Sequence, residues 1–288
     1  MTVPSAISAA RIPAGDHCGI AILANDKVLN WLLPFLESYR DTNATIPLHV
    51  IPFDDDVSQT RRAAAAYGAR FFEGDTTRVD ALAKRLYPFF PHHRRRLRKL
   101  LSLTLPCDRI LYMDADTILF RNLDKVFEAL LPGTVDFVVA SPSEDYVFNR
   151  KYADYPFLRD AMRFNDGFFL TSRDVVSLSD FEQVIDSDAA VFHRVRKRGM
   201  LFAQPLVNFV VHRLGLNVRA LADCVTNASN ESFYKAVGVK LGETGPLDWE
   251  GRDIYFAHWA GTNSKPKSRI FDSRWQEYAK RARARMTA

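Results

Sequence analysis

The sequence predicts an α/β protein built on an open, mostly parallel twisted sheet with helices on both faces. Short apolar runs alternate with helical patterns through the first half of the chain, which is the order that produces a parallel sheet. These runs are apolar throughout rather than alternating, as in strands covered on both faces. With 288 residues, of which 47% are apolar and 12% aromatic, the chain is long enough to bury a sizeable core.

The first half gives the clearest pattern. The run GIAILA is typical of a buried strand, and the leucines after it recur at i, i+3, i+4 and i+7, as on one helix face, although Pro34 interrupts them. Further strands and helices follow in turn, ending in a strand at Arg109–Met113. The expected strands are Gly19–Ala24, Pro47–Phe53 and Ala69–Gly74, and the expected helices are Val57–Gly68, Val79–Tyr87 and His92–Leu103.

The second half mixes strands and helices less regularly. We expect strands at Asp136–Ala140, Gly167–Ser172 and Asp253–Gly261, with helices around Phe181–Lys197 and Leu206–Leu214. No linker divides the chain. We therefore expect a disordered segment over 1–16, a single domain over 17–272 and a basic helical tail over 273–288.

Charge and targeting signals point to an intracellular protein that meets anionic groups. The net charge is +5, concentrated at His92–Lys99, Arg194–Arg198 and Lys280–Arg285. The chain shows neither a secretion signal nor an apolar stretch near the ~20 residues that span a bilayer. Three widely spaced cysteines lack metal-site spacing and fit a reducing compartment. We expect a cytoplasmic protein whose basic tail makes peripheral contact with an anionic membrane.

Two aspartates end the strand RILYM. Asp114 and Asp116 stand at the carboxyl end of a central strand, where open sheets bind their ligands. Residues i and i+2 of an extended chain point to the same side, so the carboxylates can converge. They would repel each other there, and a divalent cation such as Mg²⁺ or Mn²⁺ removes that penalty. The alternative is a pair of turn or helix-capping aspartates.

Two enzyme classes use this arrangement. The stretch DADT fits the D-x-D-x-T pattern of haloacid-dehalogenase-type phosphatases, in which the first aspartate accepts the phosphoryl group. Glycosyltransferases instead use D-x-D to hold a metal on the diphosphate of a sugar nucleotide. The local pattern does not distinguish them, so distant segments must.

Those segments resemble the family 8 glycosyltransferases, which include glycogenin-like enzymes and bacterial lipopolysaccharide sugar transferases. The resemblance covers most of the chain from about Gly19 onward, and its segments occur in the family's order. They are AILAND (21–26), LRKLLSLTLPCDRILYMDADTILFRNLDKVF (97–127), FNDGFFL (164–170), AQPLVN (203–208) and HWAGTNSKP (258–266). The resemblance implies a GT-A fold.

The resemblance also implies a donor site. It assigns the metal, Mn²⁺ or Mg²⁺, to Asp114, Asp116 and His258. An imidazole beside two carboxylates agrees with the softer ion, manganese. The remaining donor-binding positions that it implies are Asn25 and Asp26 near the base and ribose, Ala115 between the two aspartates, and Arg96, Gly261 and Lys265 toward the diphosphate.

Around the transferred sugar the resemblance implies Asn165, Asp166 and Gln204 as catalytic residues. This chain departs from the family at two places there. It has Ala203 where the family has an aspartate, and Asp166 where the family has a small residue. Our hypothesis is that Asp166 replaces the missing carboxylate.

The function that follows is a retaining, metal-dependent transfer of a sugar from a UDP-sugar donor to an unknown acceptor, a saccharide or glycolipid. The alternatives are a D-x-D-x-T phosphatase and a non-catalytic sugar-nucleotide-binding protein. The second is suggested by Ala203 and by Val28, which stands where the family has a base-stacking tyrosine. Nucleic-acid binding explains the charge but not the aspartates, so we expect no nucleic-acid partner.

Overall fold

The computed structural model describes residues 17–131, 133–143, 155–190, 203–260 and 269–287. A seven-stranded sheet in the order β3-β2-β1-β4-β7-β6-β8 crosses the molecule. Every neighbouring pair is parallel except the two that involve β7, which runs antiparallel to β4 and to β6. The strands are β1 (Cys18–Ala24), β2 (Leu48–Pro52), β3 (Arg70–Phe71), β4 (Arg109–Asp114), β6 (Phe137–Val139), β7 (Phe168–Ser172) and β8 (Val218–Ala220). The open, mostly parallel sheet predicted from the sequence is confirmed.

The central strands are buried on both faces, as their continuous apolar runs predict. Along β4, Ile110 and Tyr112 belong to one hydrophobic core, whereas Leu111 and Met113 belong to the other. This division follows from the alternation of side chains along a strand. The sheet therefore separates two cores and leaves its carboxyl edge as the place where polar side chains gather.

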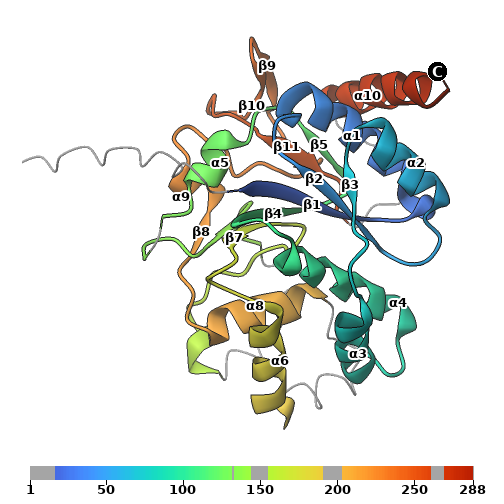
Figure 1. Cartoon of the computed structure of the whole chain (residues 1–288). Coiled ribbons are helices and arrows are strands. Elements are labelled where there is room, and N and C mark those ends of the chain that lie inside the picture. Colours follow the sequence, from blue (N-terminus) through green and yellow to red (C-terminus); the bar gives the residue numbers. More distant parts are fainter. Residues whose placement is uncertain (1–16, 132, 144–154, 191–202, 261–268, 288) are drawn as a thin grey trace, which may run out of the picture.

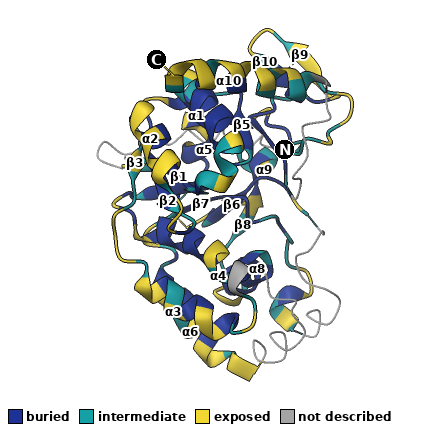
Figure 2. Ribbon diagram, turned by 90° about the vertical axis from the view of Figure 1, so that its right-hand side faces the viewer, coloured by how far each residue is buried: buried dark blue, intermediate teal, exposed yellow. Residues whose placement is uncertain are grey.

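Helices cover both faces (Figure 1). One face carries α1 (Leu29–Asn43), α2 (Ser58–Ala66) and α10 (Arg269–Thr287), and the other carries α3 (Thr77–Leu86), α4 (Pro91–Arg94), the 3₁₀ helix η2 (Arg95–Thr104), α6 (Leu178–Ser187) and α8 (Ala203–Arg213). Short elements complete the chain: η1 (Asp26–Val28), α5 (Asp124–Glu128), η4 (Pro156–Leu158) and α9 (Leu221–Cys224). Figure 2 shows that these helices bury the side facing the sheet and expose the side facing outward.

Several element boundaries differ from those expected. The helix α1 continues through Pro34, so the expected interruption is wrong. The helix α8 begins at Ala203, three residues before the expected start, and α6 ends at Ser187. The rest of the helix expected up to Lys197 lies outside the described residues, apart from the few that follow α6.

Two small sheets were not expected. The strands β5 (Thr117–Leu119) and β11 (Phe256–His258) pair antiparallel, and β9 (Lys240–Gly242) pairs with β10 (Gly245–Leu247) in a hairpin. Of these four strands only β11 lies in a segment predicted as a strand. The pair of β5 with β11 matters most, because it connects the end of the chain to the segment that follows β4.

The C-terminal helix packs onto the domain. Tyr278 and Ala282 of α10 are buried, and Arg281 forms ion pairs with Glu37 and Asp41 of α1 at 3.0 and 2.6 Å. The boundary expected at residue 272 falls inside this helix. Across the parts of the chain that the structure describes, no helix has both the length and the apolar character needed to cross a bilayer.

Candidate active site

A bend after β4 brings the two aspartates together. Asp114 is the last residue of β4, and the chain bends at Ala115 and Asp116 before β5 begins at Thr117. The sequence predicted convergence from the alternation of an extended strand, but the chain turns between the two residues. Ala115 is buried inside the bend. The carboxylates therefore approach one point from two segments of different direction.

The register of the small sheet delivers the histidine. Antiparallel pairing sets His258 opposite Thr117, the residue after Asp116. Two backbone hydrogen bonds fix this end of β11: His258 N–H donates to Ser232 O at 2.7 Å, and Trp259 N–H donates to Asp116 O at 2.9 Å. A residue 142 positions further along the chain is thus held beside the aspartates by strand pairing.

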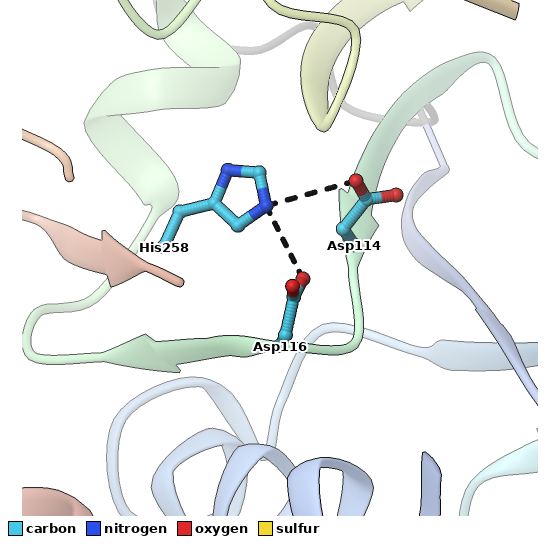
Figure 3. A group of neighbouring side chains, drawn as sticks. All are labelled: Asp114, Asp116 and His258. Atoms are coloured by element: carbon cyan, nitrogen blue, oxygen red, sulfur yellow. Dashed lines mark ion pairs between the residues drawn. The ribbon is translucent and has the colours of Figure 1, made fainter. Parts of the chain in front are cut away.

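The three side chains point at one another (Figure 3). His258 Nε2 lies 3.2 Å from Asp116 Oδ1 and 3.7 Å from Asp114 Oδ2. One ligand atom from each of the three residues lies within 4.8 Å of the others. Among the described residues, this is the group of acidic, histidine or cysteine side chains with the geometry to hold a metal ion. The predicted metal ligands are brought together.

The charges of this group are strongly coupled. Burial lowers the pKa of His258, but the carboxylates of Asp116 and Asp114 outweigh it, so its pKa lies above the usual value. Burial raises the pKa of Asp114, but Lys99, His258 and a hydrogen bond from Tyr112 Oη at 2.7 Å outweigh it and lower its pKa. The charged form of Asp114 and the protonated form of His258 thus favour each other, and a bound cation would take the place of the proton on His258.

Lys99 is a site residue that the sequence reasoning did not find. It is buried on η2, where its Nζ lies 2.9 Å from Asp166 Oδ2 and 3.6 Å from Asp114 Oδ1. Its Nζ also lies 4.9 Å from the centre of the Tyr112 ring. Although burial lowers the pKa of Lys99, the two carboxylates raise it above the usual value. The signal was a lysine between the apolar residues of a predicted amphipathic helix, hidden inside a strongly basic run.

Arg96, the expected diphosphate contact, shares a face with Lys99. Side chains three residues apart eclipse in a 3₁₀ helix, and η2 contains both residues. Arg96 is exposed, and its charge lowers the pKa of both Asp114 and Asp166. This edge therefore carries two positive side chains, Lys99, which is buried, and Arg96, which is exposed. The two other expected phosphate contacts, Gly261 and Lys265, lie outside the described residues.

The predicted sugar-side residues also lie at this edge. Asn165 Nδ2 donates to Gln204 Oε1 at 2.8 Å, and the N–H of Asp166 donates to the same oxygen at 3.4 Å. Gly167 then passes so close to the metal group that an added Cβ would lie 2.4 Å from His258 Cε1 and 2.7 Å from Asp114 Oδ2. Glycine is thus required by close approach, and Asn165, Asp166 and Gln204 adjoin the metal group.

One face of α8 holds this segment in place. Gln204, Asn208 and His212 follow each other at intervals of four residues, so they lie on one helix face. Asn208 exchanges two hydrogen bonds with the backbone of Phe164, at 3.0 and 2.8 Å, and His212 Nε2 donates to Met162 O at 2.8 Å. The loop that carries Asn165 and Asp166 is therefore positioned by a rigid helix.

Asp166 is a buried acid at the end of this loop. Its carboxylate is held by Lys99, which also donates to the Asp166 backbone oxygen at 3.2 Å. Burial raises the pKa of Asp166 above the usual value, with Lys99 opposing the effect. Ala203 is buried next to Gln204 at the start of α8.

At the end of β1, Asn25 and Asp26 make internal contacts. Asn25 Nδ2 donates to Asp54 Oδ2 at 3.0 Å, and Asp54 pairs with Arg95 at 3.1 Å. Asp26 accepts hydrogen bonds from the backbone of Gln59 and from both the backbone and the hydroxyl of Thr60, at 3.0, 2.7 and 2.8 Å. Their predicted role in nucleotide binding stays a prediction. Asp54 is a further buried acid at this edge that the sequence reasoning did not single out.

The residues of the metal group fit a divalent cation by their chemistry. Carboxylate oxygens suit Mg²⁺ and Mn²⁺, and an imidazole nitrogen shifts the preference from magnesium toward manganese. The close approach of Gly167 leaves no side chain at that position to fill the space between Asp114 and His258. The ammonium group of Lys99 is near Asp114 Oδ1, whereas the imidazole of His258 is near Asp114 Oδ2.

Comparisons with known proteins identify the fold. No family model matches the chain, and no curated protein matches it significantly. A crystal structure of the galactosyltransferase LgtC in complex with donor and acceptor sugar analogs is 16% identical over 91% of this chain and 95% of that chain, with a TM-score of 0.58. The apo form of the bifunctional glycosyltransferase WbbM is 12% identical over 97% of this chain and 53% of that chain, with a TM-score of 0.57.

A third solved structure, the apo form of the glycosyltransferase GlyE from Streptococcus pneumoniae TIGR4, is 12% identical over 94% of this chain and 62% of that chain, with a TM-score of 0.56. This chain therefore spans nearly all of one neighbour and a little over half of the other two. The chain has the GT-A fold of these glycosyltransferases, as the sequence resemblance implied.

Proposed function

We propose that this protein is a glycosyltransferase of the family 8 type that moves a hexose from a UDP-sugar to an acceptor with retention at the anomeric carbon. The observation that carries the proposal is the convergence of Asp114, Asp116 and His258 at the carboxyl edge of a GT-A sheet. Open α/β sheets bind ligands at this edge. The same edge also carries polar residues that could contact a sugar. One site could therefore bind both the diphosphate and the sugar of a nucleotide sugar.

On the donor side, Asp114, Asp116 and His258 would hold Mn²⁺, or Mg²⁺. The ion, when bound, would supply positive charge for the diphosphate that leaves with the nucleotide. Arg96 is exposed at the same edge and adds a second positive charge toward the solvent. Asn25 and Asp54, at the ends of the neighbouring strands, are placed to meet the nucleoside. Gly261 and Lys265 stay predicted phosphate contacts.

On the sugar side, Asn165, Asp166 and Gln204 would face the transferred hexose. Asp166 supplies the carboxylate that Ala203 does not, and Lys99 holds it in place through an ion pair at 2.9 Å. Lys99 Nζ also lies 3.6 Å from Asp114 Oδ1, so the ammonium group of Lys99 connects the sugar side to the metal side. A buried, fixed arrangement of charges stabilises a charged transition state without having to reorganise.

We infer retention because Asp166, the buried acid on the sugar side, is not free to act as a base. Asp166 is buried against Lys99 and is thus poorly placed to take a proton from an acceptor. A front-face attack, in which the departing phosphate oxygen takes the acceptor proton, needs no such carboxylate. We therefore propose this route, and product analysis by NMR would contradict it if the anomeric configuration inverted.

Two alternatives remain testable in the same preparation. A D-x-D-x-T phosphatase would release inorganic phosphate from simple phosphate esters, which we do not expect from a GT-A fold. A non-catalytic binding protein would take up UDP with Mn²⁺ but neither hydrolyse nor transfer a UDP-sugar. The alternative of a binding protein was suggested by Ala203, which stands where the family has an aspartate. Asp166 lies beside Gln204 and would provide a carboxylate in its place.

The deciding experiment is a titration of UDP with and without Mn²⁺, read by calorimetry and by thermal unfolding. Ligand at about 100 times its dissociation constant stabilises a fold by about 2.7 kcal/mol. We expect this stabilisation with Mn²⁺ and little without it. A panel of UDP-sugars then identifies the donor. Absence of any Mn²⁺-dependent uptake of UDP would contradict the proposal.

The proposed location is the cytoplasm, with electrostatic contact to an anionic membrane through α10. Trp275 packs against Trp31 at 5.6 Å between ring centres, and Tyr278 is buried, so neither aromatic side chain is free to enter a membrane interface. The exposed charges Lys280 and Arg283 would attract anionic lipid. Sedimentation with vesicles that contain phosphatidylserine tests this contact, and binding that is insensitive to salt would contradict it.

A further inference from the structure

A cavity of about 370 Å³ opens at the same edge of the sheet as the metal group. This volume lies within the range of small-molecule sites. Two segments line the cavity, and neither carries a residue discussed so far except Met162. The lining residues are Pro142, Ser143, Arg159, Asp160, Ala161, Met162 and Arg163.

Sheet topology places this cavity beside the site. Strand β6 is antiparallel to β7, which is antiparallel to β4, so β6 and β4 end at the same edge. Pro142 and Ser143 follow β6 there, where Pro142 forms a bridge with Phe164 and Ser143 N–H donates to Arg163 O at 2.7 Å. From Arg163 only four residues lead to Gly167, a span of at most about 14 Å even if fully extended.

The wall of the cavity is fixed by the helix that also positions the sugar-side residues. His212 of α8 holds Met162, and Asn208 of the same helix holds Phe164. The segment from Met162 to Asp166 is thus one positioned strip, with the cavity at its start and the metal group at its end. A ligand seated in the cavity would be adjacent to a sugar held at Asn165 and Asp166.

The lining has the composition of a site for an anionic saccharide. Among the described residues of the lining, Arg159 and Arg163 supply two guanidinium groups and Asp160 one carboxylate, so this part of the lining carries net positive charge. Guanidinium groups form paired hydrogen bonds with phosphate and carboxylate. Met162 and Ala161 offer apolar surface to a sugar ring, and Ser143 offers a hydroxyl.

We propose that this cavity is the acceptor site and that Arg159 and Arg163 bind an anionic substituent, phosphate or carboxylate, on the acceptor saccharide. The inference rests on the proposed function, because it takes the neighbouring edge as the donor site. It narrows the acceptor from any saccharide to one that carries negative charge close to the hydroxyl that receives the sugar.

The test measures binding of three monosaccharides to the full chain already saturated with UDP and Mn²⁺, so that the donor site is occupied. The probes are glucose 6-phosphate, glucuronic acid and glucose, followed by ligand-observed NMR. We expect at least one anionic probe to bind about tenfold more tightly than glucose, and this difference to shrink as salt is raised. Preference for glucose 6-phosphate identifies a phosphate and preference for glucuronic acid a carboxylate. Equal binding of all three overturns the proposal.

Variants assign the effect to the cavity. Arg159 is exposed, so Arg159→Ser should leave the melting temperature unchanged and weaken the anionic probe about tenfold while leaving glucose unaffected. Arg159→Lys keeps the charge but cannot form paired hydrogen bonds, so its affinity for the anionic probe should lie between those of the wild type and Arg159→Ser. The matched control is Arg173→Ser, which removes an arginine paired with Asp108 at the opposite edge of the sheet. An anionic preference that survives Arg159→Ser, or falls equally in Arg173→Ser, overturns the proposal.

Failure of this inference is distinguishable from failure of the proposed function. The titration of UDP with Mn²⁺ is completed first on each sample. If UDP binds and the anionic preference is absent, only the acceptor proposal falls. If UDP does not bind, the donor proposal falls. Binding of the three monosaccharides to the cavity can still be measured in the absence of UDP.

Discussion

The neighbouring strands β1 and β4 run parallel, and an aspartate lies at or just after the end of each, yet the two ends use these aspartates differently. At β1, Asp26 receives hydrogen bonds from Ser58, Gln59 and Thr60 at the start of α2. At β4, Asp114 and Asp116 face each other and His258. Among the described residues, no hydrogen-bond donor other than His258 pairs with the side chain of Asp116.

From this difference we infer that Asp26 serves the fold and that Asp114 and Asp116 serve as ligands. The carboxylate of Asp26 is satisfied by neutral N–H and O–H donors at a helix start, which need no further partner. The carboxylates at β4 are held together against their repulsion, and their positive partners, His258 and Lys99, are themselves buried. These buried charges depend on one another, so a substitution that neutralises one of them leaves its partner unpaired. We therefore expect substitutions at β4 to affect function and substitutions at β1 to affect folding.

The largest expected effect is that of Asp116→Asn. Loss of a hydrogen-bonding neighbour of a metal ligand already costs 10- to 100-fold in metal affinity, so loss of a ligand should cost about 1,000-fold in transfer rate, or about 4 kcal/mol. The unfolding free energy without metal should fall modestly, because the buried imidazole of His258 loses the carboxylate that lies nearest to it. Rates with a UDP-sugar and denaturant unfolding without Mn²⁺ measure both.

The matched variant is Asp26→Asn, which removes the same charge one strand away. It should retain most of the Mn²⁺ dependence of UDP binding. If Asp26→Asn abolished Mn²⁺-dependent binding while Asp116→Asn did not, the assignment of the two strand ends would have to be exchanged.

Next in size is Lys99→Met. The change removes a buried cation from between two carboxylates, and breaking a buried pair costs about 3 to 5 kcal/mol because a charge is left without its partner. We expect about 3 kcal/mol of lost unfolding free energy, since Asp166 takes up a proton more readily than an ordinary aspartate. Urea unfolding at neutral pH measures it. Adding Asp166→Asn to Lys99→Met should recover part of the loss, and a double variant as unstable as the single one would argue against the pair.

A smaller effect is expected from Gly167→Ala. The new methyl would meet His258 Cε1 at 2.4 Å and Asn165 Oδ1 at 2.8 Å, and both neighbours belong to the site. Overpacking of this kind costs about 1 to 3 kcal/mol. Part of the cost should appear as weaker Mn²⁺ binding by calorimetry, because the imidazole must move. A variant with unchanged Mn²⁺ affinity would show that the glycine serves the fold only.

Local patterns predicted the sheet and the helices on both of its faces, and the family resemblance selected Asp114, Asp116 and His258, which the structure brings together. Apolar runs of strand length placed β1 and β4, and family order placed His258. The bend at Ala115 was not predicted, because no glycine or proline marks it and the partner strand β11 lies more than a hundred residues away. Strand pairing between β5 and β11 is a long-range effect that a local pattern does not contain.

Lys99 illustrates the same limit at the level of one side chain. In the sequence it is one of several basic residues between His92 and Lys99, a run that we interpreted as meeting anionic groups. The 3₁₀ winding of η2 puts both residues on one face, and the tertiary position of that face buries Lys99 against Asp114 and Asp166 while Arg96 stays exposed. The cavity at Arg159 was equally hidden, since its two walls meet through contacts between distant segments.

The smallest effect expected is that of Asp26→Ala, which tests the folding side of the comparison. Loss of a carboxylate that caps a helix costs about 1 kcal/mol of unfolding free energy. Burial raises the pKa of Asp26, but the donors at Gln59, Thr60 and Ser58 outweigh it and bring the pKa below the usual value. The stabilisation is therefore complete above the unfolded pKa, near about 4, and is lost as the pH falls through the folded value. Urea unfolding of wild type and variant should differ most at neutral pH and converge below about pH 4. A difference that stayed constant down to pH 3 would mean that the charge of Asp26 does not cap α2, and the contrast between the two strand ends would lose its physical basis.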